Sequence, residues 1–599
     1  MKVFLKQFFS LLDQEARKKL PFLIITFLIA PLLDIVGIGM TGVFLTLISS
    51  PDYFLKIFPF NKQLLVNLNH TQLIAITGIF VILSFLIKAF AGYFIQRNTS
   101  AFSFRLALRL KLRLMKAYQF APYSFHLMRN SSYLLNRMIQ ADGYIGGILL
   151  PSLTFFSNLL IGLTILGFLL FMHPYATVGL CIIFGFVFWL NSKLFWHRAK
   201  KLGQVTSASG GEIFKIIKQT LYGLKEIRVL GTEQYFFNKL QLIAKDFADA
   251  QGVYNAFQLI PRYIVESVLM IFVILLCLVN IAIGMTPGEI VIFVGVFAAA
   301  GARLLPTMSQ LTTGLNQIRF SYPTMTCVYQ ELCTLKNLEN EFIPPACQEK
   351  LVFSKIQFNQ ACYRYPGSKQ DAVSNINLSI IKGQSVGLIG TSGAGKSTLV
   401  NILLGLLPIQ SAEILIDGQP ITNIRKWLNN FAYIPQQIFL LDDTLKHNIT
   451  LGIEDDQIDE EKIKTVLHMA RLDQVVLDLP DGVNTLIGEN GIRLSGGQRQ
   501  RVALARAFYH ERDVIVMDEA TSSLDNETEQ EVINSIQTLR GIKTLIVIAH
   551  RMSTIRHCNV IYKLEAGRVI ANGSYEEVVE LKKKEEIELY DNVGLPLHQ

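Results

Sequence analysis

The chain has 599 residues, of which 51% are hydrophobic and only 17% charged; the length allows two or more domains, and the composition excludes an entirely soluble protein and predicts membrane spans. The formal net charge of +9 favours contact with anionic lipid or phosphate, and no basic-aromatic groove or binding motif indicates nucleic acid. The seven cysteines are scattered without paired spacing, so neither a disulfide framework nor a zinc site follows from them.

Six apolar segments have the length that a membrane-spanning helix needs. They lie at about residues 20–49, 73–96, 145–171, 176–195, 254–284 and 289–305. Lysine and arginine gather after the second and fourth segments, whereas the hairpins around His173-Pro174 and Met285–Gly288 are almost uncharged. Since basic connections mark the cytoplasmic side, we expect a multi-pass protein with both termini in the cytoplasm. We assign residues 1–325 to this all-α, six-helix membrane domain.

The connections between these segments carry two further predictions. Helical patterning at Ile213–Lys218 and Tyr235–Leu240 predicts that the spans continue well into the cytoplasm. Between them, Leu221–Glu233 fits a helix–turn–helix tip, which either docks on a soluble domain or is a solvated hairpin. On the outer side, the apolar stretch Pro51–Leu68 is either a pair of short interfacial helices or a loop packed over the span ends.

Five charged residues fall inside the apolar segments: Asp34, Lys88, Arg262, Glu266 and Arg303. Charges in spans are costly and usually face a cavity or a partner. We hypothesise that the three cations line a central cavity and attract an anionic group of a substrate, such as a phosphate. Two alternatives compete with this hypothesis: Arg262 forms an ion pair with Glu266 one turn away, or Lys88 extends its amine to the membrane surface.

The second half of the chain has a different pattern. Residues 326–350 are predicted as a linker, because hydropathy falls and Phe342–Cys347 is proline-containing. Short strands then alternate with helices over residues 351–585, and residues 586–599 form a tail. This alternation predicts an α/β nucleotide-binding domain with a largely parallel core sheet. The fold is therefore expected to be multidomain, with an all-α membrane domain followed by an α/β P-loop domain.

A phosphate-binding loop organises this second domain. It follows the short apolar strand Ser385–Ile389, precedes an apolar helix, and matches the pattern G-x-x-x-x-G-K-[ST]. The loop consists of Gly390, Thr391, Ser392, Gly393, Ala394, Gly395, Lys396, Ser397 and Thr398. Its backbone N–H groups would converge on phosphate oxygens at a helix N-terminus. Lys396 would reach the β- and γ-phosphates, and the Ser397 hydroxyl would ligate Mg²⁺, so we predict ATP and Mg²⁺ as cofactors.

A second anion site is predicted about a hundred residues later. A hydroxyl and two glycines precede the helical run Arg499–Arg506, and such N–H groups at a helix N-terminus favour a bound anion. The residues are Leu494, Ser495, Gly496, Gly497 and Gln498. One chain thus carries two phosphate sites, which is the most specific signal in the sequence.

Further candidate residues follow strand ends. Asp518 and Glu519 end the strand Val514–Asp518; the first would hold Mg²⁺ and the second would deprotonate the attacking water, unless both acids are simply solvated. Gln436 could reach Mg²⁺ and water. His550 could hydrogen-bond the γ-phosphate or be structural, and Tyr365 could stack on adenine or anchor a turn before Pro366.

The order of these motifs resembles that of ATP-binding cassette (ABC) transporters, and the resemblance covers nearly the whole chain: six spans followed by one cassette, as in half-transporter exporters. The matching positions are the aromatic adenine loop (Tyr365), Walker A (Gly390–Thr398), the glutamine loop (Gln436), the signature (Leu494–Gln498), Walker B (Val514–Asp518), the catalytic glutamate (Glu519), the aspartate loop (Asp525) and the histidine switch (His550). Thr485–Gly491 resembles the exporters' coupling segment T-E-V-G-E-R-G, with Leu486 in place of the acid and Asn490 in place of arginine.

The resemblance implies an ATP hydrolase coupled to transport. Two cassettes would pair head to tail, each ATP lying between one Walker A and the opposite signature together with Asp525. The simplest assembly is a homodimer with two competent sites in a bacterial inner membrane, with a heterodimer as the alternative. Catalysis would use Glu519, with Lys396, Gln436 and His550 around the phosphates and Ser397, Gln436 and Asp518 on Mg²⁺.

The cargo is predicted less directly. The apolar external segment and the intramembrane cations favour membrane lipid as a partner and an amphipathic, lipid-linked anionic substrate. Within the family, the chain looks most like flippases of polyprenyl-diphosphate oligosaccharides. The alternatives are a lipid A, phospholipid or multidrug exporter, a gated channel, and a regulatory membrane ATPase.

Overall fold

The structure is a computed structural model, and it describes residues 2–49, 70–285, 287–344, 349–409, 414–421, 423–519, 529–530, 533–534, 537, 539–548 and 552–580. Contacts divide the chain into two compact units. The first comprises Met1–Ala121 and His126–Asn340, and the second Pro122–Phe125 and Glu341–Gln599. The external segment Pro51–Leu68 lies outside the described residues, so the prediction made for it stays a prediction.

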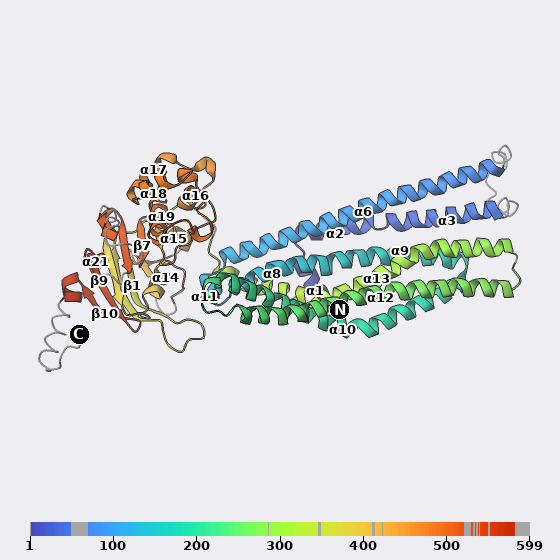
Figure 1. The fold of residues 1–599 in the computed structure, drawn as a ribbon, viewed down its shortest axis with the longest axis horizontal. Coiled ribbons are helices and arrows are strands. Elements are labelled where there is room, and N and C mark those ends of the chain that lie inside the picture. Colours follow the sequence, from blue (N-terminus) through green and yellow to red (C-terminus); the bar gives the residue numbers. More distant parts are fainter. Residues whose placement is uncertain are drawn as a thin grey trace. The chain divides into compact units, whose positions relative to one another are not determined.

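The first unit is a bundle of long helices that run alongside one another (Figure 1). Six stretches of the described chain are long and apolar enough to cross a membrane, which confirms the predicted number. The helices of this first unit are α1 (Lys2–Leu11), α2 (Gln14–Thr26), α3 (Ile29–Ser49), α6 (His70–Phe120), α8 (Ser131–Tyr144), α9 (Leu150–Met172), α10 (Pro174–Tyr222), α11 (Leu224–Val229), α12 (Glu233–Ala282) and α13 (Pro287–Asn337). The short helix α7 (Tyr123–Leu127) is divided between the two units, because Tyr123–Phe125 belong to the second.

Two of the spanning stretches are interrupted shortly before a proline. A turn at Phe27–Leu28 separates α2 from α3. Pro31 lies four residues after Phe27 and has no N–H to donate to the Phe27 carbonyl, and its ring would collide with that group in a regular helix. A π-turn at Ile145–Leu149 similarly joins α8 to α9 just before Pro151, and such turns absorb a break in the helical ladder.

The predicted extension of the spans as continuous helix is confirmed, while the cytoplasmic side of these extensions stays a prediction. α10 has 49 residues and α12 has 50, about twice the roughly 20 that a bilayer requires. The short helix α11 turns the chain between them, so the predicted helix–turn–helix tip is confirmed, while its docking stays a prediction. α13 likewise continues to Asn337, so the first residues of the predicted linker are helical.

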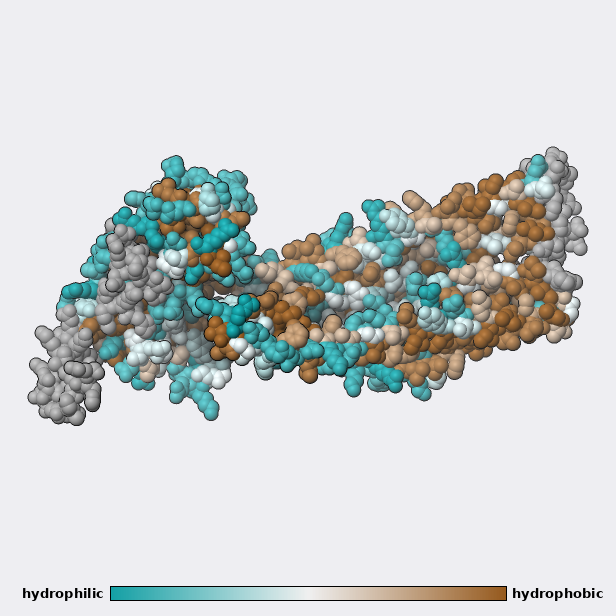
Figure 2. All heavy atoms as spheres, viewed as in Figure 1, coloured by the Kyte–Doolittle hydropathy of each residue, from teal (hydrophilic) through white to brown (hydrophobic). Residues whose placement is uncertain are grey.

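Apolar side chains cover the surface of one end of this bundle (Figure 2). On α6, for example, Phe80, Leu86 and Phe90 are exposed, and none of its most apolar 18-residue window is buried inside the structure. A soluble protein rarely exposes so much contiguous apolar surface. These helices therefore present a face suited to lipid.

The second unit is built on two sheets. Its main sheet has the strand order β10-β9-β3-β8-β7-β6, in which β10 alone is antiparallel to its neighbour, and the other sheet has the order β2-β1-β4-β5. This confirms the predicted α/β domain with a largely parallel sheet. The strands are β1 (Lys355–Tyr363), β2 (Val373–Ile381), β3 (Ser385–Gly390), β4 (Ile414–Ile416), β5 (Gln419–Pro420), β6 (Phe431–Ile434), β7 (Val514–Asp518), β8 (Thr544–Ile548), β9 (Val560–Glu565) and β10 (Arg568–Gly573).

The helices of this unit cover the main sheet, and they gather in part beside β7 (Figure 1). They are α14 (Lys396–Leu403), α15 (Ile424–Leu428), α16 (Leu445–Thr450), α17 (Glu460–Met469), α18 (Asp473–Asp478), α19 (Gly496–Tyr509) and α21 (Met552–Ile555).

Two hydrophobic cores lie on opposite faces of the main sheet. Side chains alternate between the faces of a strand: Val514 and Val516 of β7 belong to one core, and Ile515 and Met517 to the other. The first core also contains α14 and the second sheet, and the other contains α16 to α19. α14 and α19 therefore pack on opposite faces of the same sheet.

Candidate functional site

The phosphate-binding loop leaves the buried strand β3 and enters α14 as predicted. Its shape requires glycine at two positions. Gly390 has φ 150°, and a Cβ there would lie 2.2 Å from the Leu564 carbonyl oxygen. Gly395 has φ 97°, and its Cβ would lie 2.6 Å from the Ala372 oxygen. Only glycine combines these dihedrals with such close backbone approach, so the sequence here fixes the turn at the start of α14.

Lys396 closes the loop on itself. Its Nζ donates to the carbonyl oxygens of Gly390 (2.8 Å) and Thr391 (3.0 Å), and the residue is buried. Tyr365 lies beside the same helix, because its hydroxyl is 3.1 Å from Thr398 Oγ1. The structure thus brings the predicted adenine-stacking residue and the loop together.

Two carboxylates lie at the carboxyl edge of the parallel sheet, as predicted. Asp518 of β7 and Leu388 of β3 are both in register with Ile548 of β8. Asp518 therefore lies at the level of the sheet where β3 is about to enter the loop. Carboxyl ends of parallel strands are where such folds bind ligands.

The predicted catalytic glutamate and the predicted glutamine are in direct contact. Gln436 Nε2 donates to Glu519 Oε2 at 2.6 Å. Glu519 has φ 52°, and its N–H donates to the Ile548 oxygen at 2.9 Å. A non-glycine residue in this region is strained, and strain of this kind is concentrated at functional sites. The contact positions the carboxylate that we expect to act as base.

Tyr433 is a neighbour of this site that sequence reasoning missed. Its hydroxyl donates to Asp518 Oδ2 at 3.3 Å. Burial, together with the nearby Asp518 carboxylate, raises the pKa of Tyr433, so the phenol stays protonated and donates. The signal available in the sequence was its place at the end of β6, next to β7 in the sheet.

The second predicted anion site begins α19 with a capping box. Ser495 Oγ accepts from Gln498 N at 3.2 Å, and Gln498 Oε1 accepts from Ser495 N at 2.8 Å. Leu494 is buried, and Gly496 and Gly497 form the first turn. The two anion sites of one chain thus lie at the starts of two helices, α19 and α14, that pack on opposite faces of the sheet.

Two candidates, His550 and Asp525, lie outside the residues that the structure describes, so their roles stay predictions. The departure at Asn490 has a physical reason. Asn490 has φ 52°, a left-handed conformation that asparagine adopts more readily than arginine does. Leu486 pairs with Thr444 in an isolated bridge and is 55% exposed.

Two of the three membrane cations, Lys88 and Arg303, share one carboxylate. Lys88 forms a hydrogen-bonded ion pair with Asp34, and Arg303 Nε lies 3.6 Å from the same Asp34 oxygen. Asp34 is only 3% exposed. Extension of Lys88 to the membrane surface is therefore wrong, because the burial of Asp34 draws the amine inward. Arg262 is exposed, and within the described residues it has no ion pair with Glu266, so that alternative is wrong as well.

Residues Pro122–Phe125 were not anticipated. They belong to the second unit although the chain on either side belongs to the first, and Tyr123 packs against the core that contains α14. Pro122 between two helices and the aromatic pair Tyr123 and Phe125 were the signals available in the sequence.

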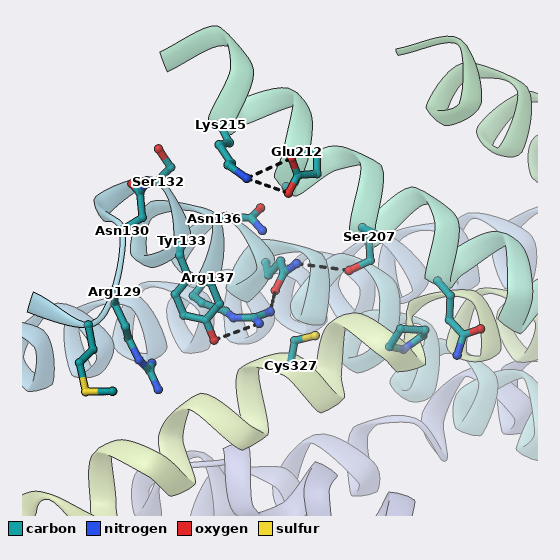
Figure 3. Close-up of a pocket in the computed structure, with 16 residues that line it drawn as sticks. Arg129, Asn130, Ser132, Tyr133, Asn136, Arg137, Ser207, Glu212, Lys215 and Cys327 are labelled. Carbon is teal, nitrogen blue, oxygen red and sulfur yellow. Dashed lines mark hydrogen bonds and ion pairs between the residues drawn. The ribbon is translucent and has the colours of Figure 1, made fainter. Parts of the chain in front are cut away.

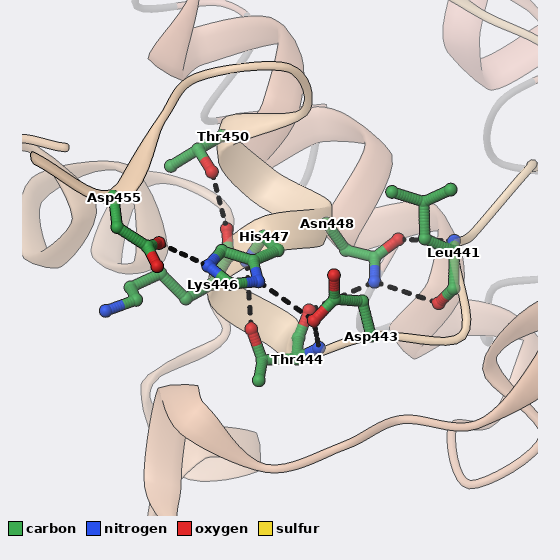
Figure 4. A network of polar contacts seen from close by, with 8 residues as sticks. All are labelled: Leu441, Asp443, Thr444, Lys446, His447, Asn448, Thr450 and Asp455. Carbon is green, nitrogen blue, oxygen red and sulfur yellow. Dashed lines mark hydrogen bonds and ion pairs between the residues drawn. The ribbon is translucent and has the colours of Figure 1, made fainter. Parts of the chain in front are cut away.

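A polar cluster around His447 of α16 was also missed (Figure 4). His447 Nδ1 lies 2.8 Å from Asp443 Oδ1, and His447 Nε2 lies 2.6 Å from Asp455 Oδ1. These hydrogen bonds raise the pKa of His447 and lower that of Asp443. The backbone carbonyl oxygen of Asp443 accepts from Ile487 N at 3.1 Å, so the chain at Asp443 is hydrogen-bonded to the segment Thr485–Gly491.

Known proteins share both halves of this architecture. Residues 21–301 match the model of the ABC transporter transmembrane region, and residues 373–522 match that of the ABC transporter ATPase, described as "ABC transporter". Together the two matches span well over half of the chain. The chain belongs to the ABC transporter family. This half-transporter is a multi-pass integral membrane protein whose cassette binds ATP and hydrolyses it to drive transport.

Relatives and a solved structure agree with this assignment. The half-transporter is 28% identical to an ATP-dependent lipid A-core flippase of Wigglesworthia glossinidia brevipalpis and 29% identical to one of Cupriavidus pinatubonensis, in each case over 82% of this chain and 84% of the relative. It also resembles the structure of a bacterial Atm1-family ABC exporter with ATP bound, with a TM-score of 0.72, 19% identity and coverage of 98% of this chain and 100% of the other. That likeness shows the exporter fold.

Proposed function

We propose that this half-transporter moves an amphipathic glycolipid with an anionic head to the outer leaflet, and that a lipid of the lipid A-core type is the first candidate. One observation carries the proposal: relatives named as ATP-dependent lipid A-core flippases match over 82% of the chain. The comparisons therefore favour the lipid A alternative over polyprenyl-diphosphate oligosaccharide, which we keep as the second candidate because both substrates join a lipid, an acidic group and a glycan.

The charge inside the membrane region supports an anionic substrate. Lys88 and Arg303 share the single carboxylate of Asp34, so this group of three carries an excess positive charge. Arg303 keeps 37% of its side chain exposed. Intramembrane charge that is not fully neutralised is expensive and usually serves a ligand. Arg303 and the exposed Arg262 are accordingly the proposed contacts for the lipid's acidic group, with Lys88 mainly holding Asp34.

The position of the two anion sites supports a homodimer. Since α14 and α19 lie on opposite faces of the sheet, one ATP would bridge the loop Gly390–Thr398 of one copy and the signature Leu494–Gln498 of the other. The dimer would lie in a bacterial inner membrane with termini and cassettes in the cytoplasm, as the basic connections predict. Asp525 and His550 would complete each site.

The oxygen donors of the site suit Mg²⁺, which binds one or two carboxylates together with substrate phosphates. Asp518, Ser397 and Gln436 would supply a carboxylate, a hydroxyl and an amide oxygen. When bound, Mg²⁺ neutralises charge on the phosphates. Glu519 would accept the proton of the attacking water while Gln436 holds its carboxylate, and Lys396 would exchange its loop carbonyls for phosphate oxygens.

Reconstitution into sealed liposomes tests the proposal. The purified protein is supplied with lipid A-core, a polyprenyl-diphosphate glycan, an ordinary phospholipid or a dye, and ATP-dependent transfer between leaflets is measured, with the Glu519→Gln variant as the inactive control. We expect the fastest transfer for lipid A-core. Faster transfer of the polyprenyl lipid would establish the second candidate. Hydrolysis without transfer of any lipid would contradict the flippase and favour a regulatory ATPase, and ATP-gated ion flux would favour a channel.

A further inference from the structure

A cavity of about 660 Å³ lies among α8, α10 and α13 of the first unit (Figure 3). Its volume is within the roughly 300–1,000 Å³ typical of small-molecule sites. Amides, hydroxyls and cations dominate its lining, including Tyr133, Asn136, Arg137 and Gln140 of α8 and Ser207 of α10. These side chains offer a ligand many hydrogen-bonding groups, and they alternate with apolar surface that includes Met128, Ala208 and Pro323.

Small residues on α10 open this space. Ser207, Ala208 and Gly211 line the cavity on α10. A Cβ at Gly211 would lie 2.9 Å from Asn136 Nδ2, so a larger residue there would crowd the amide. The run Ser207–Gly211 lies in the middle of a 49-residue helix, where glycine is unfavourable. These small residues destabilise the helix slightly, and they leave the space that forms the cavity.

Arg137 is the cation of this cavity that lacks a carboxylate. Its Nη1 donates to Gln140 Oε1 at 2.5 Å and its Nη2 to the Tyr133 hydroxyl at 3.1 Å, and both partners are neutral. The guanidinium also lies over the Tyr133 ring, 4.5 Å from its centroid, and interacts with the neutral Cys327 thiol. Within the described residues no ion pair neutralises it.

The two other cations of the lining are paired. Arg129 forms an ion pair with Glu331, and Lys215 lies 3.4 Å from Glu212. Gln140 Nε2 also donates to Ser207 Oγ at 3.3 Å, which ties α8 to α10 beside Arg137. Arg137 is half-buried and its described partners are neutral, so a ligand anion beside it would supply the opposite charge that a partly buried cation favours.

The distance from the membrane restricts the ligand. Arg137 is eight residues before Ile145, where the third apolar segment begins, and Ser207 is twelve residues after Phe195, where the fourth ends. At 1.5 Å per residue these separations are about 12 and 18 Å. The headgroup layer is only about 5–8 Å thick on each side of the hydrocarbon. The head of an ordinary phospholipid would stay near the membrane, whereas a glycan of several sugars would reach the cavity.

We propose that this cavity binds an acidic sugar unit, phosphorylated or carboxylated, in the glycan of the transported lipid. Arg137 contacts the acidic group, and the neighbouring amides and hydroxyls contact sugar hydroxyls. The inference rests on the proposed function, and it narrows the substrate class to lipids with an extended acidic glycan. The same chemistry would also bind a free acidic oligosaccharide.

Calorimetric titration of the full-length protein in lipid nanodiscs tests the site directly. The probe is the phosphorylated core oligosaccharide released from its lipid, and the matched neutral probe is the same glycan after dephosphorylation and carboxyl reduction. We expect the wild type to bind the acidic glycan. Arg137→Gln should lower this affinity at least about tenfold, because it removes a hydrogen bond from a charged group. Arg113→Gln, an exposed arginine of α6, is the control and should change the affinity less than twofold.

A second variant covers the case in which Arg137→Gln fails to fold. Ala208→Phe obstructs the cavity without removing a polar group, and thermal unfolding in the same nanodiscs reports whether each variant is folded. We expect Ala208→Phe to lower the affinity for both glycans, and Arg137→Gln to lower the affinity for the acidic glycan only. Failure of the wild type to bind the acidic glycan, or equal binding by wild type and both folded variants, would overturn the site.

The lipid assay separates this inference from the proposed function. If the wild type transfers lipid A-core but does not bind the released glycan, the cavity assignment alone is wrong. If it binds the glycan through Arg137 but transfers no lipid, the proposed function is wrong and the acidic-sugar site stands. A lipid A without its core should be transferred by Arg137→Gln as by wild type, and an equal loss for both lipids would overturn the role of the cavity.

Discussion

Lys396 in the cassette hydrogen-bonds carbonyl groups five and six residues before it, whereas Lys88 in the membrane region pairs with Asp34, 54 residues away. The first contact is nearly determined by the chain's own geometry around Gly390 and Gly395. The second exists only because α3 and α6 meet along particular faces. Substitutions in the cassette site should therefore change the rate of ATP hydrolysis without unfolding the protein. Substitutions in the group of Asp34, Lys88 and Arg303 should mainly lower its stability.

The largest expected effect is in the cassette. Glu519→Gln should lower ATP hydrolysis by about 10³-fold, since a positioned general base contributes about 10²–10⁴-fold, while nucleotide affinity and the melting midpoint stay as in the wild type. Turnover and fluorescent-nucleotide binding are measured in parallel. Glu565→Gln, at an exposed strand end, is the control. Wild-type turnover in Glu519→Gln would contradict its role as base.

In the membrane region the expected effect is on folding. Asp34→Asn leaves Lys88 and Arg303 without their carboxylate, and breaking a buried pair costs about 3–5 kcal/mol. We expect a clearly lower midpoint of thermal unfolding in detergent, partly restored by combining Asp34→Asn with Lys88→Met. Arg262→Gln removes an exposed cation that has no ion pair within the described residues, so it should leave the midpoint unchanged. An unaltered midpoint for Asp34→Asn would show that the group is not structural.

A smaller effect on ATP hydrolysis is expected for Gln436, which positions Glu519. Gln436→Ala removes the amide that holds Glu519 and should lower kcat about tenfold, because a misplaced catalytic group loses rate, with nucleotide affinity nearly unchanged. The measurement is steady-state hydrolysis over a range of ATP concentrations. Gln437→Ala, the exposed neighbour, is the control. A rise in the ATP concentration needed for half-maximal rate, without a fall in kcat, would mean that Gln436 binds nucleotide instead.

The smallest expected effect is on the melting midpoint when His447 is replaced. Its carboxylate partners Asp443 and Asp455 are close in sequence and partly exposed, so their interaction with His447 is weak. Asp443 and Asp455 raise the pKa of the His447 imidazole. The resulting stabilisation of the folded state is therefore fully present below the unfolded pKa of about 6.5 and is lost as pH rises through the raised pKa. His447→Gln should therefore lower the melting midpoint most near pH 6 and least at alkaline pH. A difference that is constant from pH 6 to 9 would contradict the ion pairs.

Much of the cassette could be predicted because its functional residues follow from local backbone requirements. Gly390 and Gly395 are needed for the loop, and a strand ending in Asp518 and Glu519 places both acids at the sheet edge. Tyr433 was missed because its contact depends on β6 lying next to β7. The pairing of Lys88 with Asp34 depends on which helix faces meet, and so does the lack of a carboxylate beside Arg137 among the described residues. A single sequence does not specify which faces meet.

The separation of α14 and α19 by the sheet has a genetic consequence for the proposed homodimer. A chain defective in Lys396 and a chain defective in Ser495 each lose both ATP sites when expressed alone. A mixed pair regains one intact site, formed by the loop of the second chain and the signature of the first. Two inactive alleles in one cell should thus complement each other, whereas two alleles defective in the same motif should not.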